Sequence, residues 1–140
     1  MYAFEQNGII IRTMNVSDVS SYVARFNIKN LNYRKNAILQ TKKVLKNLKQ
    51  DSPDLYFVVI QNNTIIGAII AKALADSITD ASVEVDIPNA SIKLIRKVKD
   101  VFVEFARDTY IYDDIFFVKG DKTLGKKIPI ADSSRWETPK

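Results

Sequence analysis

Residues 81–108 read ASVEVDIPNASIKLIRKVKDVFVEFARD and divide into two patterns at Pro88. From residue 82 to residue 87, polar and apolar side chains alternate, and this period of two predicts a strand. Pro88 cannot extend a strand ladder, so it ends the strand, and Asn89 or Ser91 can cap the helix that follows. The helix is indicated by apolar residues three and four positions apart, which are Leu94, Ile95, Val98, Val101, Phe102 and Phe105. The segment therefore predicts a strand that turns directly into a long amphipathic helix.

The turn between this strand and helix is a candidate site for an anion. The first backbone N–H groups of a helix have no partner inside the helix, and the helix dipole adds partial positive charge at the same end. A strand that runs straight into a helix aims these groups at one spot. The sequence therefore predicts a phosphate-binding turn at residues 88–93.

The composition excludes several kinds of chemistry. At 140 residues we expect one domain, 1–140, large enough to form a core without disulfides or metals. The chain has no Cys and no His, so disulfides, thiolate zinc sites, a cysteine nucleophile and an imidazole base are excluded, and we expect no metal site. Acid–base chemistry would then use carboxylates, Tyr, Lys or water. The net charge of +5 suits an anionic partner such as coenzyme A, a phosphorylated substrate or a nucleic acid.

The apolar runs of the chain are short. Residues 9–11 near the N-terminus are too few for a signal peptide, and residues 65–71 are too few to cross a bilayer. We therefore expect a cytoplasmic protein that makes no contact with a membrane.

Residues 29–50 are predicted to form a second helical segment with a concentrated positive charge. The segment contains no acid, whereas the rest of the chain has more acidic than basic residues. Its basic residues are Lys29, Arg34, Lys35, Lys42, Lys43, Lys46 and Lys49. One interpretation is a face for a nucleic acid or another anionic partner, and the alternative is an ordinary solvated helix face.

The clearest hairpin lies at residues 55–74. Two apolar, β-branched runs flank the pair Asn62-Asn63, and Asn tolerates the positive φ that a tight primed turn requires. Both runs are too apolar to keep one face in water, so we expect central strands covered on both faces. The remaining segments are predicted as a polar loop at 76–80, a short buried strand at 115–118 and an irregular tail at 120–140.

Three segments together resemble the GNAT superfamily of N-acyltransferases. These are 11–19, where an Ile-Arg strand leads to an Asp at the start of a helix; 55–67, where a hairpin ends in Gly67; and the strand–Pro–helix unit at 82–108. The resemblance implies an α/β (α+β) fold with a central mixed, mostly antiparallel sheet of about five to six strands and helices on both faces. The implied element order is β-α-α-β-β-β-α-β over residues 9–119.

The resemblance also implies a reaction. Such proteins transfer an acyl group from acetyl-CoA or another acyl-CoA to an amine. Glu84 and Asp86 share one face of the predicted strand and would be the catalytic residues, removing a proton from the amine directly or through water. The cofactor would be bound by the end of the strand and the turn, namely by Val85, Ile87, Asn89, Ala90, Ser91, Ile92 and Lys93.

The turn departs from the pattern of the family. GNAT proteins usually carry an Arg or Gln followed by Gly-x-Gly or Gly-x-Ala here, whereas residues 88–93 read PNASIK and contain no Gly. Side chains limit how closely backbone N–H groups approach a phosphate, so we expect weak or absent coenzyme A binding. No Tyr follows Tyr112 to serve as the general acid of the family. Three functions stay open: an acyl-CoA-dependent N-acyltransferase, a GNAT-like interaction or structural module without cofactor, and a nucleic-acid-binding protein.

Overall fold

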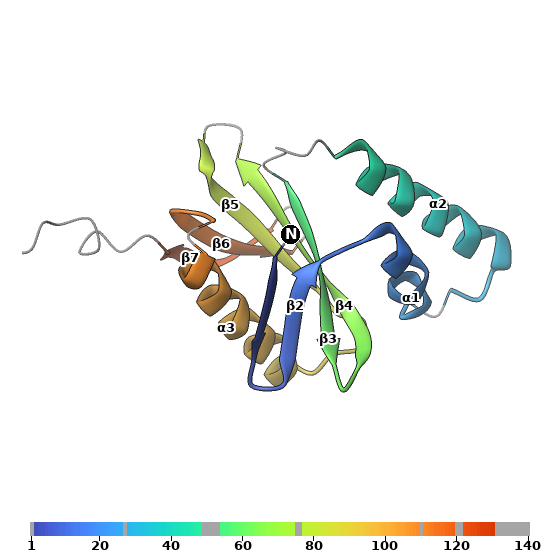
Figure 1. Ribbon diagram of the computed structural model, residues 1–140, viewed down its shortest axis with the longest axis horizontal. Helices are drawn as coiled ribbons and strands as arrows, with labels where there is room; N and C mark the ends of the chain where they lie inside the picture. The colour runs from blue at the N-terminus through green and yellow to red at the C-terminus, as the bar shows by residue number, and fades with distance from the viewer. Residues whose placement is uncertain are drawn as a thin grey trace, which may run out of the picture.

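The computed structural model describes residues 2–26, 28–48, 54–74, 77–109, 111–119 and 122–130, which form one seven-stranded sheet and three α-helices (Figure 1). The strands are β1 (Ala3–Gln6), β2 (Ile9–Thr13), β3 (Leu55–Gln61), β4 (Thr64–Leu74), β5 (Ser77–Asp86), β6 (Asp114–Lys119) and β7 (Lys122–Pro129). The helices are the 3-10 turn η1 (Val16–Asp18), α1 (Val19–Ala24), α2 (Leu31–Asn47) and α3 (Ile92–Thr109). The strands lie in chain order, and every neighbouring pair is antiparallel except β5 and β6. These two are parallel because α3 carries the chain back between them.

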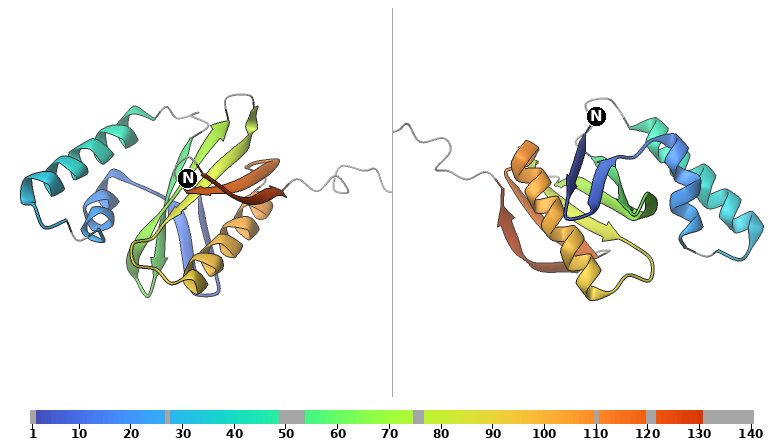
Figure 2. Two further views of the ribbon diagram at one scale, coloured as in Figure 1. Left: turned by 180° about the vertical axis from the view of Figure 1, so that it is seen from behind. Right: turned by 60° about the horizontal axis from the view of Figure 1, so that its bottom comes forward.

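Helices cover both faces of the sheet (Figure 2). α3 lies on one face, where Phe57 of β3 and Phe102 and Phe105 of α3 are fully buried in a large apolar core. α1 and α2 lie on the other face, over a smaller core. The buried residues of that smaller core are Met14, Val19, Val23, Val58 and Ala68. The prediction that β3 and β4 are covered on both faces is therefore confirmed.

Two tight turns with left-handed residues join strands at the sheet's N-terminal half. Asn62 and Asn63 have φ of 53° and 60°, so the predicted primed turn between β3 and β4 is confirmed. Asn7 and Gly8 have φ of 54° and 79° and join β1 to β2 in the same way. An Asn-Gly pair is a strong hairpin signal, and its presence explains why a strand forms ahead of the predicted core at 9–119.

Three strand boundaries differ from the sequence-based predictions. The sheet has seven strands instead of five to six, because β1 and β7 add hairpin partners at its two edges. Part of the segment predicted as an irregular tail forms β7, since an edge strand needs a partner on one side only and tolerates a poor apolar pattern and Gly125. β5 begins at Ser77, so most of the predicted polar loop at 76–80 is strand, held by backbone pairing with β4.

Gly67 allows β4 and β5 to approach each other closely. The pairing of β3 with β4 shifts beside Gly67 and leaves Ile66 as an extra residue, which is a β-bulge. A Cβ atom on Gly67 would overlap the backbone oxygen of Asp86 and lie 2.7 Å from Cγ1 of Ile87. Gly67 therefore has two roles, since it lies at a bulge and permits close packing of two strands.

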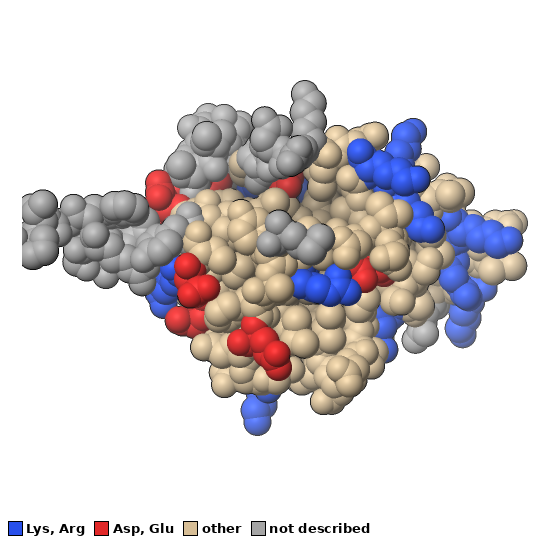
Figure 3. Space-filling view, viewed as in Figure 1, with Lys and Arg blue, Asp and Glu red and all other residues tan. Residues whose placement is uncertain are grey.

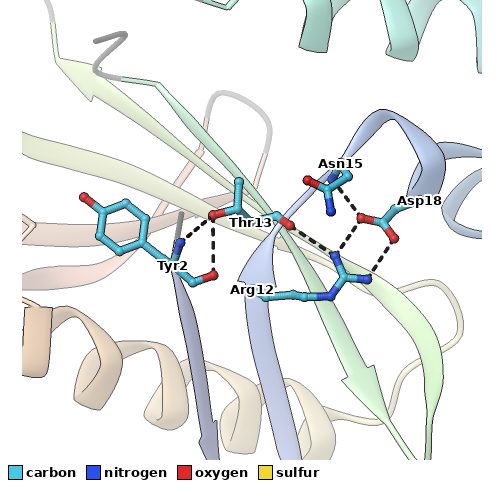
Figure 4. Close-up of polar contacts among 5 residues, drawn as sticks. All are labelled: Tyr2, Arg12, Thr13, Asn15 and Asp18. Carbon is cyan, nitrogen blue, oxygen red and sulfur yellow. Dashed lines mark hydrogen bonds and ion pairs between the residues drawn. The ribbon is translucent and has the colours of Figure 1, made fainter. Parts of the chain in front are cut away.

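An ion pair ties the end of β2 to the start of α1 (Figure 4). Two guanidinium nitrogens of Arg12 donate to the two carboxylate oxygens of Asp18 at 2.7 and 2.8 Å, and the backbone N–H of Asn15 donates to the same carboxylate at 2.7 Å. The Asp18 residue is 7% exposed. The hydrogen bonds from Arg12 hold the pKa of the Asp18 carboxyl below its usual range, although burial acts in the opposite direction. The pair fixes the direction in which α1 leaves the sheet.

Candidate functional site

β5 and β6 are paired over only part of their length. Their parallel pairing runs from Asp80 and Asp114 to Val83 and Phe117, and none of the described residues beyond these positions continues it. The strands therefore separate towards their C-terminal ends (Figures 1 and 2). Val85 and Asp86 of β5 pair with β4 along one edge, and along their other edge none of the described residues forms a strand pair with them. An unpaired strand edge offers backbone N–H and C=O groups to an extended ligand.

The residues predicted to bind a cofactor fall into two groups. Val85 is half-buried and Ile87 is buried, and both side chains pack into the core beneath α3. They can therefore offer a ligand only their backbone groups. The other five, Asn89 to Lys93, form the turn and the first residues of α3. All seven residues lie close to the C-terminal end of β5.

The turn achieves its shape without glycine. Asn89 has φ of 60°, a left-handed conformation that Asn adopts more readily than most side chains. The backbone N–H of Ala90 donates back to the carbonyl of Ile87 at 3.4 Å, so this group is already in use. The chain therefore bends tightly between β5 and α3 although this turn contains no Gly.

The first turn of α3 leaves two backbone N–H groups facing outward. The hydroxyl of Ser91 accepts a hydrogen bond from the N–H of Leu94 at 3.1 Å, which makes Ser91 the N-cap, one of the two residues predicted for this role. The N–H groups of Ile92 and Lys93 precede the first hydrogen bond inside the helix. Both side chains are exposed, and the Lys93 ammonium adds positive charge near these groups. The helix start is therefore open to an anion.

The two predicted catalytic carboxylates lie on the face of the sheet that α1 and α2 cover. Asp86 accepts a hydrogen bond from the hydroxyl of Tyr22 in α1, with 2.7 Å between Oη and Oδ2. Burial raises the pKa of the Tyr22 hydroxyl, and the hydrogen bond to Asp86 raises it further, so this hydroxyl keeps its proton. Glu84 lies two residues earlier on the same face and, like Asp86, is half-buried. The carboxylates are thus accessible and partly held in place.

A cavity of about 210 Å³ lies between α2 and the sheet, next to these carboxylates. Ala68 and Ile70 of β4 form part of its wall, and they are the direct strand partners of Asp86 and Glu84. Side chains of directly opposite residues in an antiparallel pair lie about 4.5–5.5 Å apart at Cβ, so the carboxylates flank the cavity. The remaining lining residues are Met14, Tyr22, Gln40, Thr41, Val44 and Tyr56.

Sequence reasoning placed Glu84 and Asp86 on one face but missed Tyr22 and the cavity. Tyr22 lies on the inner side of the short helix α1, next to the buried residues Val19 and Val23. No spacing rule connects it to Asp86, because 64 positions of chain separate the two residues. A polar aromatic residue on an otherwise apolar helix stripe was the one signal available.

The basic segment predicted at 29–50 forms α2 over Leu31–Asn47, and its residues Lys49 and Gln50 lie outside the described residues. The structure describes every residue of α2, and none of their side chains is buried. Lys and Arg side chains gather over α2 at one end of the molecule, while acidic side chains lie over the region of α3 (Figure 3). Apolar side chains are exposed on the same helix, including Leu39, which is 65% exposed.

Tyr112 does not join this site. Tyr112 is buried beneath α3, its hydroxyl has no hydrogen-bond partner among the described residues, and burial raises the pKa of that hydroxyl. Tyr110 and Trp136 lie outside the described residues. Within the described ranges, no three carboxylates come together as a metal site would require, and no helix is both long and apolar enough to span a membrane.

Comparisons with known proteins relate this geometry to solved structures. No family model and no curated protein matches the sequence. The ribosomal-protein-S5-alanine acetyltransferase of Vibrio fischeri is 14% identical with a TM-score of 0.54, and the match covers 84% of this chain and 73% of that one. Mutant forms of a spermidine/spermine N-acetyltransferase of Vibrio cholerae are 14% identical with a TM-score of 0.61, covering 80% and 70%. A GCN5-related N-acetyltransferase of Brucella melitensis is 12% identical with a TM-score of 0.58, covering 81% and 58%.

These identities are low, so the matches carry information about the fold alone. The matched proteins are described as acetyltransferases, and several of them as GNAT or GCN5-related members. The pairing of β5 with β6, the crossover through α3 and the helices on both faces agree with the architecture implied by the sequence. The chain has the fold of the GNAT N-acetyltransferases.

Proposed function

We propose that this chain is an N-acyltransferase that transfers an acyl group from acyl-CoA to an amine. The observation that carries the proposal is the separation of β5 from β6 after Val83 and Phe117, beside the open start of α3. Two carboxylates, Glu84 and Asp86, lie on the segment of β5 where the strands separate, and a cavity flanks them. These features support a donor site, a base and an acceptor site in one region of the molecule.

The described residues fit coenzyme A in part. Acyl-CoA would supply the acyl group as a thioester. The N–H groups of Ile92 and Lys93, with the Lys93 ammonium, suit a diphosphate at the start of α3. The edge of β5 at Val85 and Asp86, beyond its pairing with β6, suits an extended arm that contains amides. The N–H groups of Ala90 and Leu94 already have partners, so this turn has few donors to offer, which supports weak binding of the cofactor.

The chain's own residues have a definite task in the reaction. An amine arrives as an ammonium and must lose a proton before its nitrogen can attack the thioester carbonyl. Glu84 or Asp86 would accept that proton, directly or through water, and Tyr22 would hold Asp86 in position. Formation of the C–N bond would break the C–S bond of the thioester, the nitrogen would lose its second proton to water, and the leaving sulfur would gain a proton from water. No side chain is assigned as the general acid.

Titration with acetyl-CoA tests the donor half of this proposal. We expect a dissociation constant weaker than about 1 μM, because the turn offers few donors. Lys93→Glu should weaken binding by roughly tenfold, since it places a negative charge beside the phosphates. Lys97→Glu, an equal charge change one helical turn away, is the matched control and should have a smaller effect.

Two results would overturn parts of the proposal. Binding near 1 μM or tighter would mean that the turn binds the cofactor well without glycines, and the expectation of weak binding would fail. The absence of heat at high ligand concentration, with a folded protein, would favour the alternative of a GNAT-fold interaction or structural module. Transfer of acetyl groups to any amine would exclude that alternative.

A second candidate function is binding of an anionic partner, such as a nucleic acid, by α2. The observation that favours it is a 17-residue helix with no buried side chain and no acidic residue. Such binding should be weak, independent of sequence and steeply dependent on salt. A variant with Lys42, Lys43 and Lys46 changed to Glu should abolish it. If the wild-type protein binds neither DNA nor RNA at low salt, this candidate fails.

A further inference from the structure

The cavity between α2 and the sheet has an uneven distribution of charge. Its lining residues include four aliphatic or thioether side chains and two tyrosine rings, and the polar members Gln40 and Thr41 are neutral. The Thr41 hydroxyl already donates to the carbonyl of Ala37 at 2.8 Å, inside the helix. None of the lining residues that the structure describes is charged.

Among the described residues, the carboxylates next to the cavity lie on its β5 side. Glu84 and Asp86 are the strand partners of the wall residues Ile70 and Ala68, and Tyr22 both lines the cavity and donates to Asp86. On the opposite side lies α2, whose sequence contains no acidic residue. An ammonium group therefore finds a carboxylate at the β5 side and no negative partner among the described residues that line the cavity.

We infer that the acceptor is a small amine with a single positive charge and an apolar, aromatic body, and that polyamines are poor acceptors. This inference rests on the proposed function, because it assigns the cavity to the amine. The ammonium would lie against Glu84 and Asp86, and the body would lie among Met14, Val44 and the rings of Tyr22 and Tyr56.

The size of the cavity limits that body. Pockets for drug-sized ligands measure roughly 300–1,000 Å³, so a cavity of about 210 Å³ suits a smaller molecule of one or two rings. Aromatic rings favour edge-to-face or offset contacts with other rings, and an ammonium is attracted to a ring face. The Tyr22 and Tyr56 rings provide such contacts close to the carboxylates.

A polyamine would meet a different environment. Its second ammonium would find no carboxylate among the described lining residues and would lie close to a helix that is itself basic. A charge moved from water into apolar surroundings without a partner is strongly disfavoured, and like charges repel. The arrangement therefore selects against ligands with two separated cations.

Calorimetric titration of the full chain with 2-phenylethylamine and with spermidine tests the inference. The titrations are run without and with coenzyme A, so that an ordered binding sequence does not hide the result. We expect 2-phenylethylamine to bind at least about tenfold more tightly than spermidine. Spermidine binding as tightly as 2-phenylethylamine, or no 2-phenylethylamine binding by the folded protein in either condition, would overturn the inference.

A pair of charge variants on α2 locates the selectivity in the cavity. Val44 lines the cavity and is 43% exposed, so Val44→Asp should fold and place a carboxylate at the side that lacks one. We expect Val44→Asp to tighten spermidine binding and weaken 2-phenylethylamine binding. Leu39→Asp makes the same charge change at an exposed position that does not line the cavity, and it should leave the ratio unchanged.

The outcomes separate this inference from the proposed reaction. An equal response to Val44→Asp and Leu39→Asp would mean that overall charge controls selectivity, and the inference would be wrong. Selective amine binding without acetyl transfer would leave the acceptor class standing while the proposed reaction fails. Acetyl transfer to spermidine in preference to 2-phenylethylamine would support the proposed reaction and would show that the inferred acceptor class is wrong.

Discussion

The two faces of the sheet share the same strands but differ in how completely a helix covers them. On one face, Phe105 of α3 contacts four other aromatic rings, with centroid distances between 5.3 and 5.9 Å. On the other face, α2 has no buried side chain and leaves a cavity of about 210 Å³ above the sheet. Dense packing supplies stability, whereas incomplete packing leaves room for a ligand. The α3 face therefore holds the fold together, and the α2 face holds the candidate acceptor site.

The largest expected effect is on the α3 face. Phe105→Ala should lower the free energy of unfolding by about 3–5 kcal/mol, because it removes a fully buried ring from the centre of the aromatic cluster. Leu39→Ala on α2, where the side chain is 65% exposed, should change it by less than about 0.5 kcal/mol. Urea denaturation of both variants measures the contrast. Similar losses in the two variants would show that the faces contribute equally.

The next effect concerns the ion pair that anchors α1. Asp18→Asn should cost about 1.5–3 kcal/mol at pH 7, because it removes a buried carboxylate that accepts hydrogen bonds from Arg12 and Asn15. The folded-state pKa of Asp18 is depressed, so its contribution is complete above the unfolded pKa of about 3.9 and is lost as pH falls through the folded pKa. The difference between wild type and variant should therefore shrink below about pH 4.

An exposed pair supplies the control for this experiment. Glu104 and Arg107 form an ion pair on α3 with both side chains more than 40% exposed. Glu104→Gln should change stability by less than about 1 kcal/mol. If Asp18→Asn costs no more than Glu104→Gln, the pair at the start of α1 is not what fixes the helices of this face.

Gly67 connects the packing of the sheet to the candidate site. Gly67→Val should cost about 1–3 kcal/mol, because its side chain would overlap the backbone of β5 at Asp86 and Ile87. The same overlap moves Asp86, so amine binding should weaken as well. Thermal unfolding and amine titration measure the two effects. A fully stable variant with unchanged amine binding would show that Gly67 is incidental.

Apart from the control variants Leu39→Ala and Glu104→Gln, the smallest expected change in stability comes from Tyr22→Phe. The ring stays and one hydrogen bond to Asp86 is lost, so the cost should be about 1 kcal/mol. Amine affinity should nevertheless fall, because Asp86 loses the group that holds its orientation. Fluorescence-detected unfolding and amine titration separate the two quantities. Unchanged affinity would remove Tyr22 from the site.

Local patterns in the sequence predicted the strand at 82–87, the helix with Phe102 and Phe105 and the Asn62-Asn63 turn, and the structure contains all three. Each depends on neighbours within a few residues, which a sequence displays directly. The edge strands β1 and β7 were not predicted. Each has one strand partner, so neither needs the apolar pattern that identifies a central strand.

The carboxylates of the candidate site were predicted from a local pattern, whereas the rest of the site was not predicted. Alternation along β5 placed Glu84 and Asp86 on one face, because the period of a strand is fixed. It could not show which helix faces them. The hydrogen bond from Tyr22 to Asp86 and the cavity under α2 depend on how α1 and α2 dock on the sheet, and that docking joins residues far apart in the chain.

Asn89 gives the turn before α3 a property that is useful for protein engineering. Its left-handed φ of 60° is one that glycine adopts without strain. The bend at this position is therefore compatible with glycine, which has no side chain. A single change, Asn89→Gly, would remove the side-chain bulk at the bend without asking the backbone to take a new shape. This single substitution is therefore the simplest way to make the backbone of the turn more accessible to a ligand.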